Sequence, residues 1–447
     1  MRGRSHRWLN RIAAETAELA MGRRTATLAV QLSRSQRLAA PRLQLLSQQK
    51  SLRLLRRAST FTRFFHGPLR PEAELTCRDD LQQFAADMCL PVPPERRMRC
   101  ASRGTTGEGV SFFWDRTRQA WDRANRQRAH AWFGFQPGDR ELHIWPIDSP
   151  AGASAHWRER FRRLRDTVIG ERLLDAGQAL GDGWREAIIE WERFRPQRLT
   201  TYPSVLCEII RRAEGCGLRL PTGALCHVFL TGEVLFDWQR RLIQSHLRTP
   251  VSMMYGVQEV GAIAFECPRG GWHLSAESVS VEVLADGRPA ATGALGEIVA
   301  TGLESRAMPV VRYCTGDIVH HAPQTCCCVL GLPKIPPVLG RAGDFLVAAD
   351  GTWIEPAAIV DALGPLLGDG EFVVHQAPDR RLSILWTGGG PHSRARHSAA
   401  ADRLRALVAD SQDVDFIRVG RLPRSESMKL RYVTSALSSG GLARRRV

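Results

Sequence analysis

The sequence contains almost no lysine: Lys50, Lys334 and Lys429 stand against 59 arginines in 447 residues. A coding bias toward arginine explains this ratio on a solvated surface, where either cation serves. The two side chains differ in their chemistry, because a compact ammonium does what a planar guanidinium cannot always do. A lysine retained under such a bias is therefore a candidate for a chemical role.

Three other features are missing. No apolar run approaches the ~18 residues needed to cross a bilayer, and no apolar segment near the N-terminus is typical of a secretory signal. Without such a signal, the 11 cysteines predict reduced thiols and a cytoplasmic protein. The GxxxxGK(S/T) phosphate loop is also absent, which excludes the nucleotide-binding class that depends on it.

The formal net charge of +16 is concentrated at the two ends of the chain. Residues 1–70 contain 15 basic side chains but only Glu15 and Glu18 as acids, and the tail ends in three arginines, so residues 71–443 are neutral overall. Solvated arginine-rich helix faces are the commonest cause of such a pattern, and we expect no nucleic-acid partner. The alternative is a nucleic-acid or membrane-surface binding protein that uses residues 1–70.

The length predicts two or more domains. We expect a basic helical N-terminal segment over residues 1–70, a large domain over 71–340 and a small C-terminal domain over 341–447. Residues 5–60 are rich in leucine, alanine and arginine, which predicts helix with Leu43, Leu46 and Leu52 on one apolar side. A short helix through Met88 is expected to begin at the Thr76–Asp79 cap.

Strands and helices alternate through the middle of the chain, which predicts an α/β fold with mostly parallel strands. The patterns place strands at 141–145, 228–233 and 251–254, and helices at 204–215 and 236–246. From His273 onward, short alternating strands and an Asp286-Gly287 turn predict an antiparallel subdomain. After Gly340-Arg341, a compact α+β unit is expected, with helices at 355–367 and 397–410 and strands at 372–375, 382–386 and 416–420.

The segment Tyr255-Gly-Val-Gln-Glu-Val-Gly261 follows a buried strand. Because open α/β sheets bind ligands at the carboxyl ends of their strands, Tyr255 could stack on a base there and Glu259 could hold a metal ion. Upstream, Ser102–Gly109 is rich in glycine and threonine, so its N–H groups and hydroxyls could close around phosphate oxygens. Each segment is also compatible with an ordinary surface loop, so its weight depends on the other motifs.

Together the motifs resemble those of the adenylate-forming ligases, the superfamily of acyl-CoA synthetases. The resemblance is strongest to the phenylacetate-CoA ligase branch, which includes the CapK-like proteins. The motifs stand in family order as Ser102–Gly107, Tyr202-Pro-Ser204, Leu230-Thr-Gly-Glu233, Tyr255–Gly261, Val311-Arg-Tyr-Cys-Thr-Gly-Asp317, Gly340-Arg341 and Leu422-Pro-Arg-Ser-Glu-Ser-Met-Lys429. Each motif alone is common, whereas the ordered set is specific.

The resemblance implies a large adenylation domain, a small mobile lid and a two-step reaction. A carboxylic acid, expected to be an aryl acid, attacks the α-phosphorus of ATP and pyrophosphate leaves. The acyl-adenylate then passes to the thiol of coenzyme A or of a carrier-protein phosphopantetheine. Because one anion must approach another, Mg²⁺, cations and N–H dipoles must be preorganised around the phosphates. The alternatives are an amine acceptor and a non-catalytic relative of the same fold.

The resemblance also implies the roles of single residues. Lys429 would reach the carboxylate and the α-phosphate, Glu259 would ligate Mg²⁺, and Arg312 would support them. Tyr255 would lie against adenine, and Asp317 would accept hydrogen bonds from the ribose hydroxyls. The other residues expected to bind ATP or AMP are Ser102, Gly104, Thr105, Thr106, Gly107, Gly232, Glu233, Gly256 and Arg341.

Structural alternatives stay open for three of these residues. Asp317 could cap a turn, Arg341 could pair with Glu297 or Asp344, and Lys429 could be a surface lysine. The sequence also departs from the family pattern at four places. These are Arg103 in place of Ser or Thr, Gly109 in place of Pro, Gly343 in place of a hinge acid, and Ser427-Met428 in place of a glycine pair. The departures motivate the non-catalytic alternative.

A second group consists of Cys267, His273, Cys326 and Cys328. In the CapK-like branch a Glu-Cys segment, a following His and a Cys-x-Cys pair recur. The resemblance therefore implies a closed tetrahedral Zn²⁺ site with a structural role. The spacing is not that of paired CxxC motifs, and free buried cysteines are the alternative.

Overall fold

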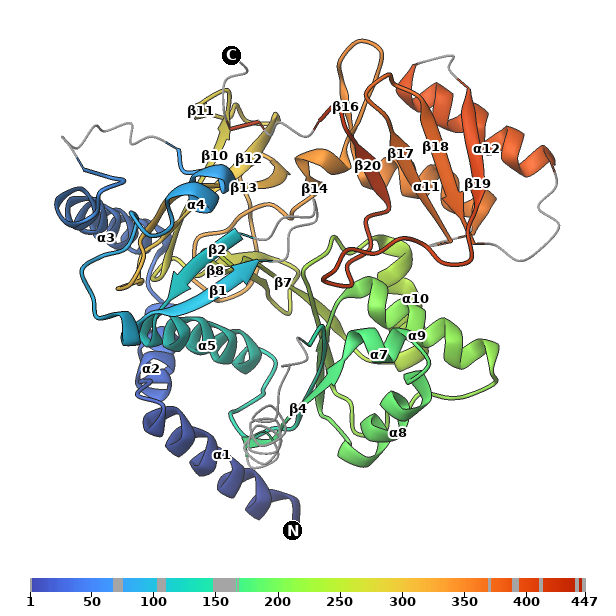
Figure 1. Cartoon of the computed structure of the whole chain (residues 1–447). Helices are drawn as coiled ribbons and strands as arrows, with labels where there is room; N and C mark the ends of the chain where they lie inside the picture. Colours follow the sequence, from blue (N-terminus) through green and yellow to red (C-terminus); the bar gives the residue numbers. More distant parts are fainter. Residues whose placement is uncertain are drawn as a thin grey trace.

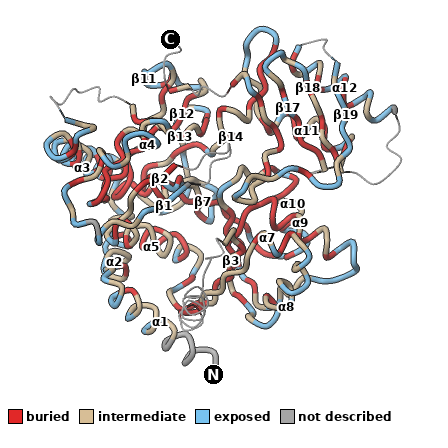
Figure 2. The backbone as a smooth tube through the Cα atoms, in the orientation of Figure 1, coloured by how far each residue is buried: buried red, intermediate tan, exposed pale blue. Residues whose placement is uncertain are grey.

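The computed structural model describes residues 2–66, 75–102, 110–147, 166, 169–368, 371–387, 394–409, 413–438 and 442–443. The body of the molecule contains a seven-stranded sheet, a five-stranded sheet and a two-stranded hairpin. An α/β layer formed by the last hundred residues lies beside it (Figure 1). Figure 2 shows that buried residues follow the strands of both parts, whereas α3 is exposed along much of its length. Within the described part of the chain, no helix is long and apolar enough to span a membrane.

The N-terminal segment forms the predicted helices, namely α1 (Arg2–Ala20), α2 (Thr25–Ser35) and α3 (Ala40–Phe61). The predicted apolar side of α3 is wrong, because Leu46 and Leu52 are 38% and 55% exposed. The buried positions of α3 follow helical spacing instead, at Leu43, Ser47, Leu54 and Ala58. Leu43 packs on Ala276 and Leu332, so α3 is part of the body rather than an appended arm.

The predicted helix after Thr76 is shorter than expected. It is α4 (Arg78–Phe84), and its N-cap is Cys77 rather than Thr76. The Cys77 backbone N–H donates to the Asp80 carboxylate at 2.6 Å. Thr76 instead bridges to Tyr313. A two-stranded hairpin follows, in which β1 (Met98–Ser102) pairs with β2 (Val110–Trp114).

The central sheet has the strand order β4-β3-β5-β6-β7-β8-β9. Its first five strands are parallel, as predicted: β3 (Glu141–Trp145), β4 (Glu171–Asp175), β5 (Arg198–Thr201), β6 (His227–Thr231) and β7 (Val251–Val257). The last two, β8 (Gly261–Glu266) and β9 (Trp272–Leu274), are antiparallel. β7 extends through Tyr255 and Gly256 to Val257, so this motif lies in a hairpin strand rather than in a loop.

Different helices cover the two faces of the central sheet. On one face, Phe229 of β6 packs against Ala129 of α5 (Arg116–Ala131). On the other face, Val228 and Leu230 pack against the helices that connect the parallel strands. These are α7 (Ala176–Leu180), α8 (Trp184–Phe194), α9 (Pro203–Gly215) and α10 (Asp237–Leu247). The alternation along β6 is what places apolar side chains on both faces.

A five-stranded antiparallel sheet with the order β11-β10-β12-β13-β14 completes the body. Its strands are β10 (Val279–Ala285), β11 (Arg288–Pro289), β12 (Leu295–Gly302), β13 (Val310–His320) and β14 (Gly340–Arg341). The predicted Asp286-Gly287 turn joins β10 to β11, with φ values of 50° and 73°. The register pairs Asp317 of β13 with Arg341 of β14, so these two motif residues are cross-strand neighbours.

The C-terminal unit contains the predicted helices α11 (Pro356–Leu367) and α12 (Arg394–Val408). They pack on a four-stranded sheet of β17 (Phe372–Gln376), β18 (Leu382–Trp386), β19 (Val414–Arg418) and β20 (Val433–Ser435). A small ladder of β15 (Leu346–Val347) and β16 (Trp353–Ile354) lies near its start. The loop between β19 and β20 carries Lys429 and returns to the body, as Figure 1 shows.

Candidate active site

A cavity of about 350 Å³ lies where the C-terminal unit meets the body. The end of β7 supplies Tyr255 and Gly256, the turn after β6 supplies Gly232 and Glu233, and the antiparallel sheet supplies Asp317 and Arg341. The loop between β19 and β20 supplies Lys429, Leu430, Arg431 and Tyr432. The structure therefore brings together seven of the predicted site residues, which lie far apart in the sequence.

Tyr255, Asp317 and Arg341 form a connected polar cluster in this cavity. The Tyr255 hydroxyl donates to Asp317 Oδ2 at 2.8 Å, and Arg341 Nε lies 3.4 Å from Asp317 Oδ1. Burial raises the pKa of the Asp317 carboxyl, and the Arg341 guanidinium opposes that shift. Arg341 forms an ion pair with Asp317. Asp344 accepts the Arg341 backbone N–H at 2.8 Å, and its charge also acts on the Arg341 guanidinium.

Lys429 enters the same cavity from the C-terminal unit. Its Nζ lies 5.5 Å from the centroid of the Tyr202 ring, and it is not a surface lysine. Burial and the neighbouring Arg341 cation lower the pKa of Lys429. Gly232, with φ of 79°, leaves room for these groups, because a Cβ there would stand 2.5 Å from the Tyr202 ring and 3.2 Å from Lys429 Cε.

Glu233 fixes the lysine loop to the body. Its carboxylate accepts hydrogen bonds from the Ser204 N–H and hydroxyl, at 2.9 and 2.8 Å, and from the Leu430 N–H at 2.8 Å. Arg424 of the same loop donates to the Ser204 hydroxyl at 2.7 Å and to the Met428 carbonyl at 2.9 Å. Glu233 was predicted to bind nucleotide, and the structure shows that it holds the residue after Lys429.

Arg431, in the loop between β19 and β20, holds the segment where the C-terminal unit begins. Arg431 donates from Nε to Asp344 Oδ1 at 2.6 Å and from Nη2 to the Gly343 carbonyl at 2.7 Å. Met428 has φ of 61°, in the left-handed region that glycine adopts without cost. Met428 therefore occupies one position of the expected glycine pair with a strained backbone.

Two predicted catalytic residues lie outside this cavity lining. Glu259, in the turn after β7, is 8% exposed, and its carboxylate has neither an ion pair nor a hydrogen bond within the described part of the chain. It is close enough to act on the charges of Lys429 and Arg341. Arg312 instead binds Glu282 with two hydrogen bonds of 3.0 Å, which directs its guanidinium to β10.

The predicted phosphate loop is described only at its ends. Ser102 is the last residue of β1 and pairs with Val110 of β2. Gly104, Thr105, Thr106 and Gly107, together with Arg103 and Gly109, lie outside the described residues. Their role in binding phosphate stays a prediction.

All four tyrosines of the chain gather around this site. Tyr202, Tyr255 and Tyr313 belong to predicted motifs. Tyr313 is 5% exposed and lies near Glu259, Asp317 and Arg341. Tyr432 lines the cavity and accepts a hydrogen bond from Gln239 at 3.3 Å. Sequence reasoning missed Tyr432, Arg424 and Arg431 as site residues. The rarity of tyrosine was the available signal for Tyr432, whereas arginine is too abundant here to give one.

A second chamber, of about 390 Å³, shares the wall formed by Met254, Tyr255, Gly256 and Val257 with the first cavity. It lies over the α5 face of the central sheet. Leu173, His143 and Thr200 are paired across adjacent strands and form its floor. Trp145 and Thr231 extend that floor. Its wall comes from Asp122 and Arg126, one turn apart on α5. The end of β7 thus separates two adjoining spaces.

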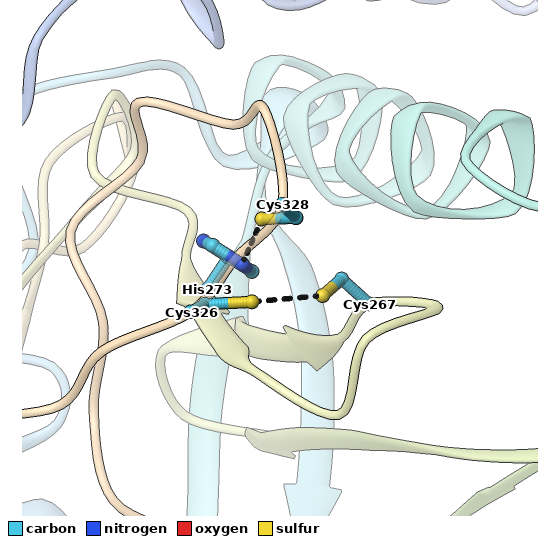
Figure 3. A group of neighbouring side chains, drawn as sticks. All are labelled: Cys267, His273, Cys326 and Cys328. Atoms are coloured by element: carbon cyan, nitrogen blue, oxygen red, sulfur yellow. Dashed lines mark hydrogen bonds between the residues drawn. The ribbon is translucent and has the colours of Figure 1, made fainter.

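The four predicted zinc ligands converge, as Figure 3 shows. All four ligand atoms lie within 4.8 Å of one another. Cys267 Sγ is 3.6 Å from Cys326 Sγ, and Cys328 Sγ is 3.1 Å from His273 Nε2. A Zn–S bond of about 2.3 Å places two thiolates of a tetrahedral site nearly 4 Å apart. The spacing of the two sulfurs therefore fits a metal site, and Cys327 between the last two ligands is exposed.

Backbone groups orient these ligands. The Arg269 N–H donates to Cys267 Sγ at 3.4 Å, and the second ring nitrogen of His273 lies 3.4 Å from the Leu332 carbonyl. Such contacts around the first ligands fix their direction and tautomer. Burial lowers the pKa of His273 to about 4, so the imidazole is neutral at neutral pH, as a ligand must be.

Comparison with known proteins connects this arrangement to a protein class. No protein-family model matches the chain. The chain is similar to the phenylacetate-coenzyme A ligases of Thermus thermophilus (28% identity over 160 residues), Pseudomonas putida (28% over 303) and Escherichia coli (24% over 399). These similarities cover 34%, 61% and 80% of this chain. They span 36%, 64% and 83% of the relatives, so the first two are matched over less than two thirds of their length.

A solved structure of 2-hydroxyisobutyryl-CoA ligase in the postadenylation state has a TM-score of 0.72 to this chain at 15% identity, over 91% of this chain and 92% of that one. The same ligase in the thioesterification state has a TM-score of 0.58 over 90% and 91%.

The fold is that of the adenylate-forming ligases. In sequence the chain is phenylacetate-CoA ligase-like. The predicted α/β class and the predicted resemblance are both confirmed.

Proposed function

We propose that this protein activates a carboxylic acid as an acyl-adenylate, using ATP and releasing pyrophosphate. The observation that carries the proposal is the convergence of Lys429, Tyr255, Asp317, Arg341 and Gly232 on one cavity between body and lid. The phenylacetate-CoA ligase-like sequence supports the same reaction. A domain boundary near residue 340, with 341–447 as the moving lid, is part of this proposal.

The chemistry of each side chain suits its proposed role. Asp317 is an acceptor-only group when ionised, which suits the ribose hydroxyls, and Arg341 beside it favours the ionised form. Lys429 lines the cavity that borders the shared wall of the two spaces, where the carboxylate and the α-phosphate would meet. A buried cation placed before the reaction stabilises charge that develops in the transition state.

Glu259 is the proposed Mg²⁺ ligand. It fits the ion because it is a buried carboxylate without an ionic partner in the described ranges, and hard divalent cations prefer such oxygens. When bound, the ion would neutralise phosphate charge. Arg312 is not proposed to touch substrate, since Glu282 holds its guanidinium.

The second chamber is the proposed acid-binding site, because it meets the nucleotide cavity at Tyr255 and Gly256. The aromatic side chains Trp114, Trp145 and Phe265 in its lining support an aryl acid. We propose coenzyme A as the acceptor thiol, since a CoA-dependent activity is named for all three relatives. A carrier-protein phosphopantetheine is the second candidate.

We also propose a structural Zn²⁺ ion held by Cys267, His273, Cys326 and Cys328. It would join the turn after β8 and strand β9 to the 321–339 segment that leads to β14. A closed set of four protein ligands leaves no open position for chemistry.

ATP–pyrophosphate exchange with a panel of aryl and aliphatic acids tests the proposed function. We expect exchange that requires Mg²⁺ and one class of acid. Absence of exchange with every acid, in protein shown to be folded, would contradict it and favour a non-catalytic relative.

A further inference from the structure

The acid chamber is larger than its aromatic part. From β7 it passes over β6 and β5 to β3, which at about 4.8 Å per strand is about 14 Å. The end near β7 contains Met254 and Phe265, which are buried apolar side chains. An aryl ring seated there leaves the part over β3 to a substituent at the end of the acid remote from its carboxylate.

The remote part of the chamber contains polar side chains beside Trp145 and Leu173. Arg126 of α5 and His143 of β3 line it, together with Glu171 of β4. The same three residues line a smaller adjoining space, so the polar groups continue behind the chamber. A purely apolar acid would cover these groups without replacing the hydrogen bonds that they make with water, which disfavours its binding.

Three acidic side chains near this end are held by neighbouring donors, and Asp166 is a fourth acid in the lining. Asp122 accepts from the Ala262 N–H at 2.9 Å and from Arg126 Nη2 at 2.8 Å. Glu171 accepts from Arg123 at 2.9 Å. Glu141 behind His143 accepts from Arg198 at 2.6 Å and from Thr200 at 2.7 Å.

Donors remain. A guanidinium has five N–H groups. Within the described part of the chain, Arg126 pairs with Asp122 through one nitrogen, and the Arg126 side chain is 42% exposed. His143 Nε2 lies 3.6 Å from Glu141 Oε1, beyond ordinary hydrogen-bond distance. The remote end therefore offers N–H groups to an oxygen.

We propose that the acid activated here is an aryl acid with an oxygen substituent remote from the carboxylate, and that Arg126 and His143 recognise that oxygen. This inference rests on the proposed function. Arg126 and His143 would determine specificity without taking part in adenylation. A site built to hydrogen-bond a substrate oxygen discriminates strongly against the analogue that lacks it.

Pairs of acids that differ only in that substituent test the inference. Hydroxyl and methyl are similar in size, so we compare 3- and 4-hydroxyphenylacetate with 3- and 4-methylphenylacetate by kcat/KM in pyrophosphate exchange. We expect at least one hydroxy acid to exceed its methyl partner by tenfold or more. In R126M and H143L this ratio should fall to within about threefold of unity, while KM for ATP stays unchanged.

Two variants keep the test free of folding effects. R116M makes the same substitution at an exposed position of α5 and should keep the wild-type ratio. R126K retains a donor and should restore part of the preference. Methyl acids that match or exceed both hydroxy acids in a wild type with robust exchange would overturn the inference and leave the proposed function intact. No exchange with any acid would overturn both.

Discussion

The two spaces on either side of β7 differ in how their residues are arranged along the chain. The nucleotide cavity takes Tyr255, Asp317, Arg341 and Lys429 from short motifs. The acid chamber takes Arg126, His143 and Leu173 from ordinary helix and strand positions that belong to no motif. They nevertheless share one wall, Met254–Val257.

The difference follows from what each space must hold. A nucleotide presents the same phosphates, sugar and base to every relative, so the same residue types suit it each time. The acid varies, and its chamber is shaped by side chains that a fold can exchange without loss of stability. Substitutions should therefore separate the two spaces: changes in the first alter ATP use, and changes in the second alter the choice of acid.

The largest effect is expected at Lys429. K429A should lower the exchange rate by about 10²–10³, or about 3–4 kcal/mol, because it removes a preorganised cation from the transition state. The loss should be the same for every acid, since the cation serves the step that all acids share. K334A removes a lysine outside the cavity and is the matched control. Exchange at the wild-type rate in K429A would refute the role of Lys429 in adenylation.

The pH dependence of the exchange rate also tests the role of the Lys429 ammonium. Burial and Arg341 lower the pKa of Lys429 from 10.5, so the ammonium loses its proton at a lower pH than an exposed lysine does. Exchange should therefore decline as pH rises toward alkaline values, on a limb that begins below 10.5. This alkaline decline of the exchange rate should be missing in K429R, because the guanidinium stays protonated. If K429R shows the same alkaline decline, the titrating group is not Lys429.

Substitution of Asp317 is expected to have a smaller effect, which is weaker binding of ATP. D317N keeps the size of the side chain but removes the charge that pairs with Arg341 and would face the ribose. KM for ATP should rise about tenfold, close to 1.4 kcal/mol, with KM for the acid unchanged. D286N alters an exposed aspartate at the β10–β11 turn and serves as control. A change in KM for the acid alone would break the division between the two spaces.

The zinc group should affect stability more than either space. C328A should reduce bound zinc below about 0.3 equivalents and lower the free energy of unfolding by about 3 kcal/mol or more, as loss of a structural metal does. Because the group lies outside both linings, the preference among acids should not change. C226A, at an exposed cysteine, is the control. Less than 0.3 equivalents of zinc in the wild type would refute the site.

The smallest effect is expected at Met428. A side chain at φ of 61° costs roughly 1–2 kcal/mol relative to ordinary backbone, and glycine adds back about 0.5–1 kcal/mol of chain entropy. M428G should therefore raise the exchange rate about twofold by easing closure of the lysine loop. S427G makes the same replacement one residue earlier, where φ is not positive, and should not. A slower M428G enzyme would show that the loop benefits from the side chain.

The sequence alone predicted the order of the elements and several residues that line the first cavity. Alternating strands and helices predicted the parallel sheet, and the motifs predicted that Tyr255, Asp317 and Lys429 would share a cavity, which they do. These features are local, since periodicity and short motifs are written in neighbouring residues. The buried side of α3 was assigned wrongly because each of several leucine stripes suits a helix, and only packing on Ala276 and Leu332 selects one.

The tertiary structure alone decided the parts that depend on distant partners. Glu282 takes Arg312 away from the cavity, Glu233 holds the lysine loop, and Arg431 binds the hinge at Asp344. The acid chamber exists only because strand register brings Leu173, His143 and Thr200 into one row beneath α5. Pairing across a sheet is set by contacts between segments distant in sequence, so no single stretch of the chain records it.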